Sequence, residues 1–318
     1  MNIETSPITS IELGVNERFQ IQRTRLQPDG PARGLKRFSV VTGTHGDELE
    51  GQYVCYELIR RVRQHPEHLA GIIDVYPALN PLGIDSISRG IPNFDLDLNR
   101  LFPGDENGCL PEFYAKQVID ALSGSDLCVD IHASNIFLYE IPQIRINELT
   151  AKTLVPLAKL ANVDYIWVHA TATVLEATLA HSLNTTGTPC LVIEAGIGMR
   201  LTKEYGDQIV DGLLNVMREM GIWTGPVAPV RKPRISTDGK VNFLNANEPG
   251  IFMATAEHCA HVQEGEVVGN ILDPLSGQVA EELRAPCSGL MFTLRAYPVV
   301  YAGSLIARVL ADVEGGAK

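Results

Sequence analysis

Between about residues 36 and 221, short apolar runs alternate with longer amphipathic segments, and this alternation constrains the fold more than any other feature of the sequence. The apolar runs are strand-length, and they are apolar enough to be covered on both faces. Strands separated by amphipathic helices indicate an α/β fold with a sheet flanked by helices. The predicted strands span residues 37–42, 72–77, 127–132, 165–168 and 190–194.

Four segments between these strands have the apolar spacing of helices. They span residues 48–63, 111–122, 150–161 and 202–220. In the first of them, Leu49, Tyr53 and Tyr56 recur near the helical period, whereas most charged residues lie on other faces. Residues 11–26 alternate in polarity and are predicted to form a hairpin at an edge of the sheet.

The composition changes at residues 224–233, where three prolines in a short span end the preceding helix. We therefore predict an α/β catalytic domain over residues 1–225 and a small all-β domain over residues 226–318. Residues 262–269 and 285–289 resemble biotinyl and lipoyl carrier barrels, but Leu290, Met291 and Phe292 follow where a carrier needs its modified lysine. The second domain is expected to be barrel-like without carrier chemistry.

Two of the apolar strands lead into residues that suit a zinc ion. The run from Val40 leads to His45, and Glu48 follows three residues later, where it is expected to open a helix. The strand at 127–132 ends in His132, which supplies a third ligand. Two close ligands, one distant ligand and a free fourth position for water are typical of catalytic zinc, whereas structural zinc favours four protein ligands. One Zn²⁺ per chain is therefore predicted.

A further buried strand delivers Glu194 at its carboxyl end, and we predict that Glu194 is the general base that takes a proton from water. The long polar loop at residues 80–104 leaves another strand end and is expected to approach the same edge of the sheet. It brings Arg89, Asn99 and Arg100, whose N–H groups suit a substrate carboxylate or a developing oxyanion.

Charge and composition exclude several classes of protein. The chain has 26 basic and 38 acidic residues and a formal net charge of −12, without a long basic run, so no nucleic-acid partner is expected. No apolar run approaches bilayer-spanning length and the amino terminus lacks a signal pattern, so no membrane partner and a cytoplasmic location are expected. The six cysteines lack paired spacing, and the sequence leaves a homo-oligomer open.

The ordered set of His45 to Glu48, residues 95–100, Asp130 to His132 and residues 193–196 resembles the succinylglutamate desuccinylase and aspartoacylase family of the zinc carboxypeptidase-like superfamily. The resemblance covers roughly residues 36–225 and implies a zinc-carboxypeptidase-like mixed sheet. It also implies that the enzyme hydrolyses the amide of a small N-acyl amino acid. By the same resemblance, zinc is held by His45, Glu48 and His132, Glu194 is the base, Arg89 polarises the carbonyl, and Asn99 and Arg100 bind a substrate carboxylate.

Two other functions remain open at this stage. The chain could be a metallocarboxypeptidase that trims peptides, in which case a wide groove is expected instead of a pocket covered by the β domain. It could also be a non-catalytic binding module, although every required residue type is present. Arg89 and Arg100 have a structural alternative as ion-pair partners of nearby aspartates. Asp130 is expected to orient a metal ligand, and His169 is a further histidine at a strand end.

Overall fold

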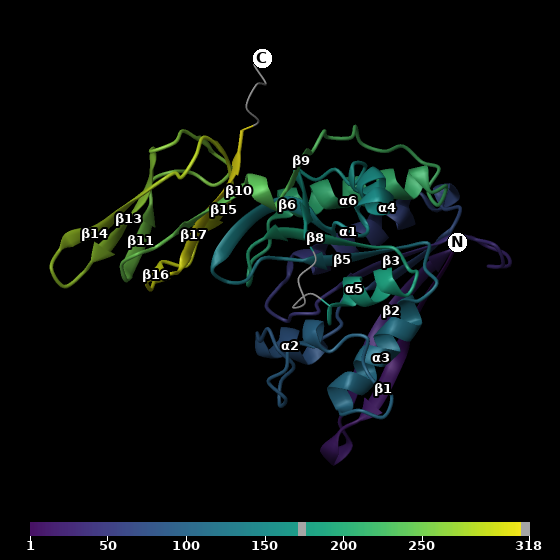
Figure 1. The fold of residues 1–318 in the computed structure, drawn as a ribbon. Helices are drawn as coiled ribbons and strands as arrows, with labels where there is room; N and C mark the ends of the chain where they lie inside the picture. The colour runs from purple at the N-terminus through teal and green to yellow at the C-terminus, as the bar shows by residue number, and fades with distance from the viewer. Residues whose placement is uncertain (171–175, 313–318) are drawn as a thin grey trace.

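A large mixed β-sheet runs through the protein in the computed structural model, which describes residues 1–170 and 176–312 (Figure 1). Four strands in its centre, each an apolar run, are parallel neighbours in the order β4, β3, β5, β8. Their bounds are Ile72–Tyr76, Arg37–Thr42, Leu127–His132 and Cys190–Gly196. Because parallel strands end at the same edge, the residues that follow β3, β5 and β8 are brought together there.

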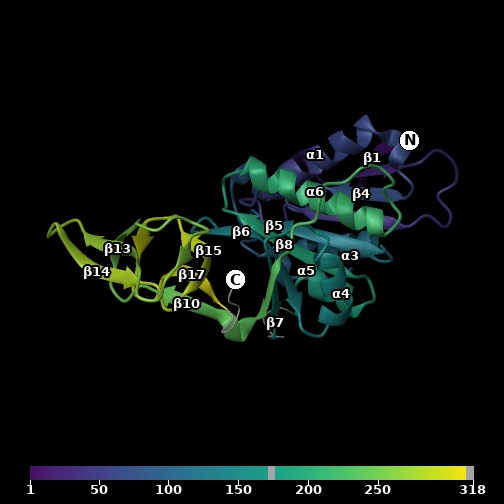
Figure 2. The ribbon, with the colours of Figure 1, turned by 90° about the horizontal axis from the view of Figure 1, so that it is seen from above.

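Helices cover both faces of this central sheet (Figure 2). α1 (Glu50–Gln64) and α6 (Lys203–Glu219) pack on one face, where their apolar side chains join one hydrophobic core. α3 (Leu110–Leu122) and α5 (Leu179–Thr185) pack on the opposite face around a second core. The other α-helices among the described residues are the short α2 (Pro81–Ser86) and α4 (Ala151–Ala158). The predicted α/β class is therefore confirmed.

Several details differ from the sequence-based prediction, which also lacked helices α2 and α5. The edge hairpin is longer than residues 11–26, because β1 (Asn2–Glu12) pairs along its whole length with β2 (Arg18–Gln27). β1 is mostly polar and contains Pro7, so it lacks the apolar pattern of a buried strand. Helix α1 begins at Glu50, so Glu48 does not open it but lies in the turn before it. The long strand β6 (Leu138–Asn147) was not predicted at all.

β6 joins the two parts of the molecule. Its first residues pair with β15 (Gly289–Arg295) of the C-terminal region, and its later residues pair with β8. On the side opposite β8, the later residues of β6 pair with β7 (Tyr165–His169), which in turn pairs with β9 (Arg234–Thr237). The sheet is consequently continuous from the helix-covered part into the β-rich part.

The C-terminal region is antiparallel. Beyond β15, the large sheet continues through β17 (Leu305–Ala311) and β10 (Val241–Asn245), and the short β12 (His261–Val262) pairs with β15. A second sheet is ordered β14, β13, β11, β16, with bounds Gln278–Arg284, Val267–Asp273, Gly250–Ala254 and Val299–Val300. A separate hydrophobic core is made by side chains of residues 246–309. The boundary at residue 225 stays a prediction, since β9 lies beyond it and pairs with β7.

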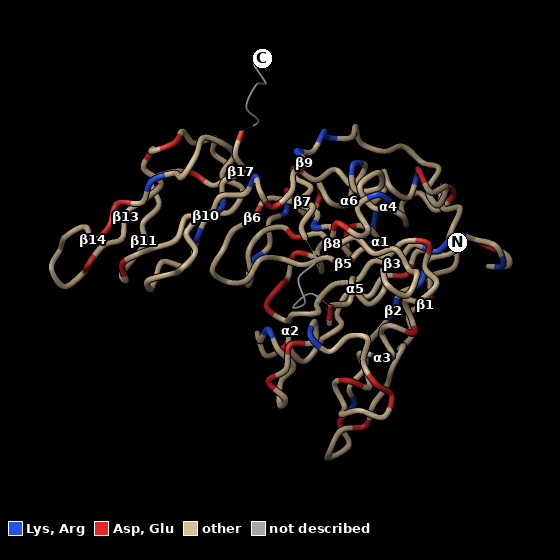
Figure 3. The backbone as a smooth tube through the Cα atoms, viewed as in Figure 1, with Lys and Arg blue, Asp and Glu red and all other residues tan. Residues whose placement is uncertain are grey.

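Positions of basic and acidic residues are distributed along the whole of the described backbone (Figure 3). Within the described residues, no helix has both the length and the apolar character that crossing a bilayer requires.

Ion pairs connect α1 to α6, and they give a pH-dependent prediction. Glu57 is buried and accepts hydrogen bonds from Arg60 and Arg61 at 2.6–2.7 Å, and Arg61 also donates to Asp211 of α6 at 2.5 Å. The hydrogen bonds from Arg60 lower the pKa of Glu57 to about 2 despite the opposing effect of burial. Because this pKa lies below the unfolded value, the stabilisation is complete above about pH 4.5 and is lost as the pH falls toward 2.

The Glu57→Gln substitution is therefore expected to lower the free energy of unfolding by about 1 kcal/mol at pH 7, since its partly exposed arginines limit the effect. Urea unfolding at pH 7 and pH 3 measures this difference, which should shrink at the lower pH. Glu219→Gln, at an exposed position of α6, is the matched control and should have little effect at either pH. An equal loss of stability at both pH values would contradict the ion-pair explanation.

Candidate active site

Neighbouring parallel strands place His132 and Glu194 side by side. His132 is the last residue of β5, and its register partner on β8 is Glu194. Side chains alternate along a strand, so Asp130 lies on the same face as His132. This face is turned toward α3 and α5, while the intervening residues Val129 and Ile131 pack into the core beneath α1 and α6. The apolar pattern of the strands thus fixes which side chains enter the site.

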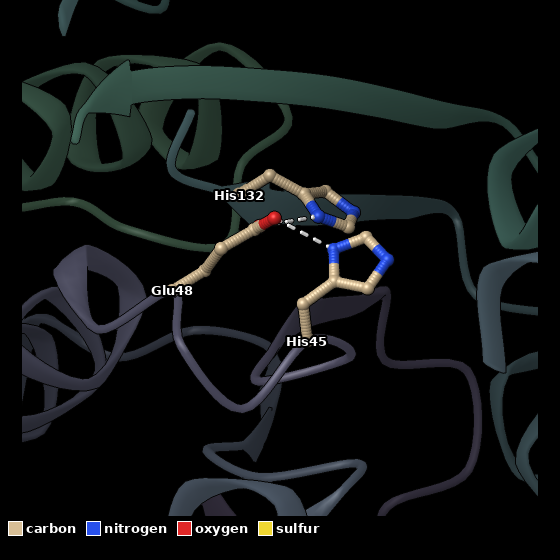
Figure 4. Close-up of side chains that lie close together, drawn as sticks. All are labelled: His45, Glu48 and His132. Carbon is tan, nitrogen blue, oxygen red and sulfur yellow. Dashed lines mark hydrogen bonds and ion pairs between the residues drawn. The ribbon is translucent and has the colours of Figure 1, made fainter. Parts of the chain in front are cut away.

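The three predicted metal ligands converge (Figure 4). His45 lies in the loop between β3 and α1, and its Nδ1 is 2.7 Å from Oε1 of Glu48. The Nδ1 of His132 is 2.9 Å from the other oxygen, Oε2. One ligand atom from each residue lies within 4.8 Å of those of the other two, and all three side chains are buried. Two imidazole nitrogens and a carboxylate oxygen fit a zinc ion.

The charges in this cluster favour a cation. Burial raises the pKa of Glu48, but the two imidazoles outweigh burial and lower that pKa to about 2. Burial also opposes charge on the imidazoles, yet Glu48 and Asp97 raise the pKa of His45, and Asp130 and Glu48 raise the pKa of His132 well above its ordinary value. The negative field that favours protonated imidazoles in this cluster also favours a divalent metal ion at the same place.

Each histidine is oriented by a second carboxylate. The Nε2 of His45 is 3.0 Å from Oδ1 of Asp97, and the Nε2 of His132 is 3.0 Å from Oδ2 of Asp130. Carboxylates in this position fix the ring and leave the other nitrogen free to face a metal. The contact expected for Asp130 is confirmed. The contact of Asp97 was not predicted, although Asp97 belongs to the polar loop that the sequence analysis singled out.

Arg89 reaches the cluster because the loop after β3 packs closely against α2 and the residues that follow it. Gly46 donates its N–H to the carbonyl of Ser88, and a Cβ at Gly46 would lie 2.0 Å from the carbonyl carbon of Gly83. Only glycine permits this approach. Arg89 then lies 3.0 Å from Glu48 and 3.2 Å from Asp97. Arg89 therefore forms an ion pair with a nearby aspartate, as the structural alternative predicted, and it also borders the site.

A cavity of about 710 Å³ opens beside the cluster, and its size is typical of a small-molecule site. Asn99 and Arg100 line it together with Arg89 and Glu194, so the structure brings all the predicted site residues to one cavity. The side-chain oxygen of Asn99 accepts the N–H of Leu179 at the start of α5, which fixes the orientation of its amide. His169 and His181 line a further part of the same cavity.

Three charged residues of the cavity were missed by the sequence analysis. Arg145 on β6 lies 3.4 Å from Glu194 and 2.8 Å from Glu140, and Arg308 on β17 lies 2.5 Å from Glu140. Burial raises the pKa of Glu194, and the charge of Arg145 opposes this effect. A sequence signal for Arg145 did exist, because Gln143, Arg145 and Asn147 alternate with isoleucines. Nothing in the local sequence points to Arg308.

A mixed sheet that carries a His–Glu–His cluster and a neighbouring glutamate at one end of its parallel strands defines an α/β enzyme with a candidate metal site. Residues 35–220 match the catalytic domain of the Succinylglutamate desuccinylase/Aspartoacylase family. The chain belongs to this family of deacylases, which confirms the resemblance found in the sequence.

Sequence similarity to a described deacetylase and structural similarity to solved structures extend over both parts of the chain. The N-alpha-acetyl-L-2,4-diaminobutyric acid deacetylase of Halomonas elongata is 26% identical over 280 residues, which cover 86% of this chain and 81% of that protein. The product-bound structure of the ectoine utilization protein EutE (DoeB) from Ruegeria pomeroyi aligns with a TM-score of 0.82 at 22% identity, covering 98% of this chain and 95% of that one. A succinylglutamate desuccinylase/aspartoacylase structure from Rhodobacter sphaeroides also gives 0.82 at 22% identity, covering 98% and 96%. These structures share the fold, including the C-terminal β region.

Proposed function

We propose that this protein is a zinc-dependent hydrolase that cleaves the amide bond of a small N-acyl amino acid. The observation that carries the proposal is the convergence of His45, Glu48 and His132 in a cavity that Glu194 also lines. When bound there, zinc supplies a Lewis acid and lowers the pKa of water. The protein supplies the ligands, a buried base and a set of cationic side chains.

The cavity residues have separate roles in this reaction. Glu194 takes a proton from the attacking water and later gives it to the leaving nitrogen, so that water and amide become a carboxylate and an amine. Arg89 donates N–H groups to the carbonyl oxygen as negative charge develops on it. Asn99 and Arg100 bind the carboxylate of the substrate and hold the amide against the base.

The similarity to a diaminobutyric acid deacetylase supports an acetylated amino acid as substrate. The location of the cavity supports a small amide over a peptide. Its lining includes Leu138 at the start of β6 and Arg308 of β17, so the β-rich region forms part of its wall. An extended peptide would need a groove open along that side.

We expect the purified, zinc-loaded protein to hydrolyse at least one member of a panel of acetylated, succinylated and formylated amino acids, with N-acetylated diaminobutyric acid among them. Release of the free amine, followed by a ninhydrin-type reaction, measures turnover. A tripeptide series with free carboxyl ends tests the carboxypeptidase alternative. Turnover of the peptides without turnover of any N-acyl amino acid would overturn the proposed substrate class.

The carboxylates behind the histidines give a prediction on metal affinity. Asp97→Asn and Asp130→Asn should each weaken zinc binding by about 10- to 100-fold, because a neutral amide orients the imidazole less strongly and makes it less basic. Competition with a chromophoric chelator measures the affinity. Asp120→Asn, on the exposed surface of α3, is the control and should bind zinc like the wild type. Unchanged affinity in both site variants would show that these contacts do not support a metal.

A further inference from the structure

A buried glutamate holds two arginines from different parts of the chain against the wall of the cavity. Glu140 of β6 is 1% exposed and accepts hydrogen bonds from Gln143 at 2.5 Å, from Arg145 at 2.8 Å and from Arg308 at 2.5 Å. Glu140 and Arg308 are 168 residues apart in the sequence. A buried carboxylate that accepts hydrogen bonds from two guanidinium groups and one amide is strongly held, since charge-assisted hydrogen bonds are short and strong and losing one of the arginines would leave a buried charge poorly compensated.

Arg145 lies between this carboxylate and the proposed base. Its Nη2 donates to Glu140, and its Nη1 lies 3.4 Å from Oε1 of Glu194. The planar guanidinium can contact two carboxylates at once, so fixing one side of it fixes where the other side points. β6 and β8 are antiparallel neighbours in which Gln143 is the register partner of Glu194 and Val192 that of Arg145, so Arg145 and Glu194 lie diagonally across the two strands.

The β-rich region contributes to this arrangement through β17. The guanidinium carbons of Arg145 and Arg308 lie 5.7 and 5.9 Å from the centre of the Trp167 ring, and Arg308 also lies 5.8 Å from the centre of the Phe243 ring. These aromatic contacts restrict both arginines to their side of the cavity. The backbone pairing of β6 with β15 keeps Glu140 in register with the β-rich region.

We propose that Arg145 is a positioning residue for Glu194, and that Arg308 of the C-terminal region holds Arg145 in place through Glu140. This inference rests on the proposed function, since it assigns Glu194 its role as base. It gives the C-terminal β region a part in the reaction. Arg308 of this region contacts Glu140, Glu140 contacts Arg145, and Arg145 contacts the proposed base Glu194.

The test uses the full-length zinc-loaded protein and three substitutions. Arg145→Gln should lower kcat by about 100-fold, with KM changed less than about threefold, because a mobile Glu194 is a poorer base while substrate binding is unaffected. Arg145→Lys should recover part of the loss, since it keeps the charge without the planar fork. Arg308→Gln should lower kcat by about tenfold, and the Arg145→Gln/Arg308→Gln double variant should be no worse than Arg145→Gln alone. Arg284→Gln, at an exposed position of β14, is the matched control and should keep wild-type kcat.

A second comparison separates positioning from a general structural effect. In a Glu194→Gln background, Arg145→Gln should cause no further loss, because the group that it positions is gone. A multiplied loss there would overturn the proposal, and so would a large rise in KM with unchanged kcat, which would make Arg145 a binding group for the substrate. Thermal unfolding and zinc content identify a variant that fails to fold, in which case Arg145→Lys and Arg308→Lys carry the same comparison.

Crystal structures of the wild type and of Arg308→Gln provide a measurement that does not depend on the substrate. The Arg145 guanidinium should contact Glu194 in the wild type and move away from it in the variant. An unmoved Arg145 would overturn the proposed role of Arg308. If the wild type hydrolyses neither the N-acyl amino acids nor p-nitrophenyl acetate, the proposed function fails, while the structural comparison still tests the positioning contact.

Discussion

Glu194→Gln is expected to bind zinc with wild-type affinity and to lose about 10³-fold or more in kcat. The amide has nearly the same shape as the carboxylate but cannot accept a proton from water, and a positioned general base typically contributes a factor of 10² to 10⁴. Zinc should remain because the three proposed ligands do not include Glu194, which lies on the neighbouring strand. Steady-state kinetics on the best substrate of the panel and metal analysis of the same sample measure the two properties.

The control for this experiment is Glu219→Gln, which changes an exposed glutamate of α6 and should leave kcat and zinc content unaltered. Hydrolysis by Glu194→Gln at the wild-type rate would rule out Glu194 as the base. Loss of zinc together with activity would instead show that Glu194 contributes to holding the metal.

Removal of the metal is expected to abolish hydrolysis and to lower the melting temperature, and added zinc should restore both. A metal that binds only the folded chain stabilises it by about 4 kcal/mol when the free metal concentration is about 1,000 times the dissociation constant. Without a cation, His45, Glu48 and His132 are held in a buried site by hydrogen bonds and ion pairs alone, to one another and to Asp97, Asp130 and Arg89. Activity and thermal unfolding are measured after chelation, dialysis and titration with zinc.

His132→Ala should show the same loss of hydrolysis and the same lower melting temperature as the chelated protein, because it removes one of the proposed zinc ligands. Added zinc should not restore either property. The matched control is His65→Ala, which removes a histidine from an exposed position after α1. Full activity in protein that contains no metal would defeat the zinc mechanism. Recovery with cobalt or manganese but not with zinc would retain the site and correct the identity of its metal.

Much of the site was predictable because strand ends mark it. His132 and Glu194 each end an apolar run. Because each run is long enough for a strand but too short for a helix, its last residue is expected at the end of a buried strand, which limits where the side chain can lie. The placement of Asp130 on the face of His132 follows from strand alternation in the same way. The family resemblance added the order of the motifs and the expected zinc, and the match over residues 35–220 confirms the family.

The contacts that were missed lie on segments with weak local patterns. β6 contains Pro142, which argues against a strand within a sheet, so the alternation of residues 143–147 was not recognised as part of a longer strand. Glu48 was expected inside a helix because Glu48 and Glu50 are equally compatible with a first turn, and the hydrogen bonds of the folded loop decide between them. Asp97 was recognised only as a neighbour of arginines.

The sequence by itself determined the α/β class, and it named the three candidate metal ligands and the candidate base, because hydrophobic periodicity and strand ends are properties of short segments. Only the tertiary structure decided that β6 pairs with both β8 and β15, and that Arg308 therefore reaches Glu140 and Arg145 across 168 residues. The physical reason is that pairing between distant strands depends on the burial and hydrogen bonding of the whole sheet, and no short segment of sequence contains that information.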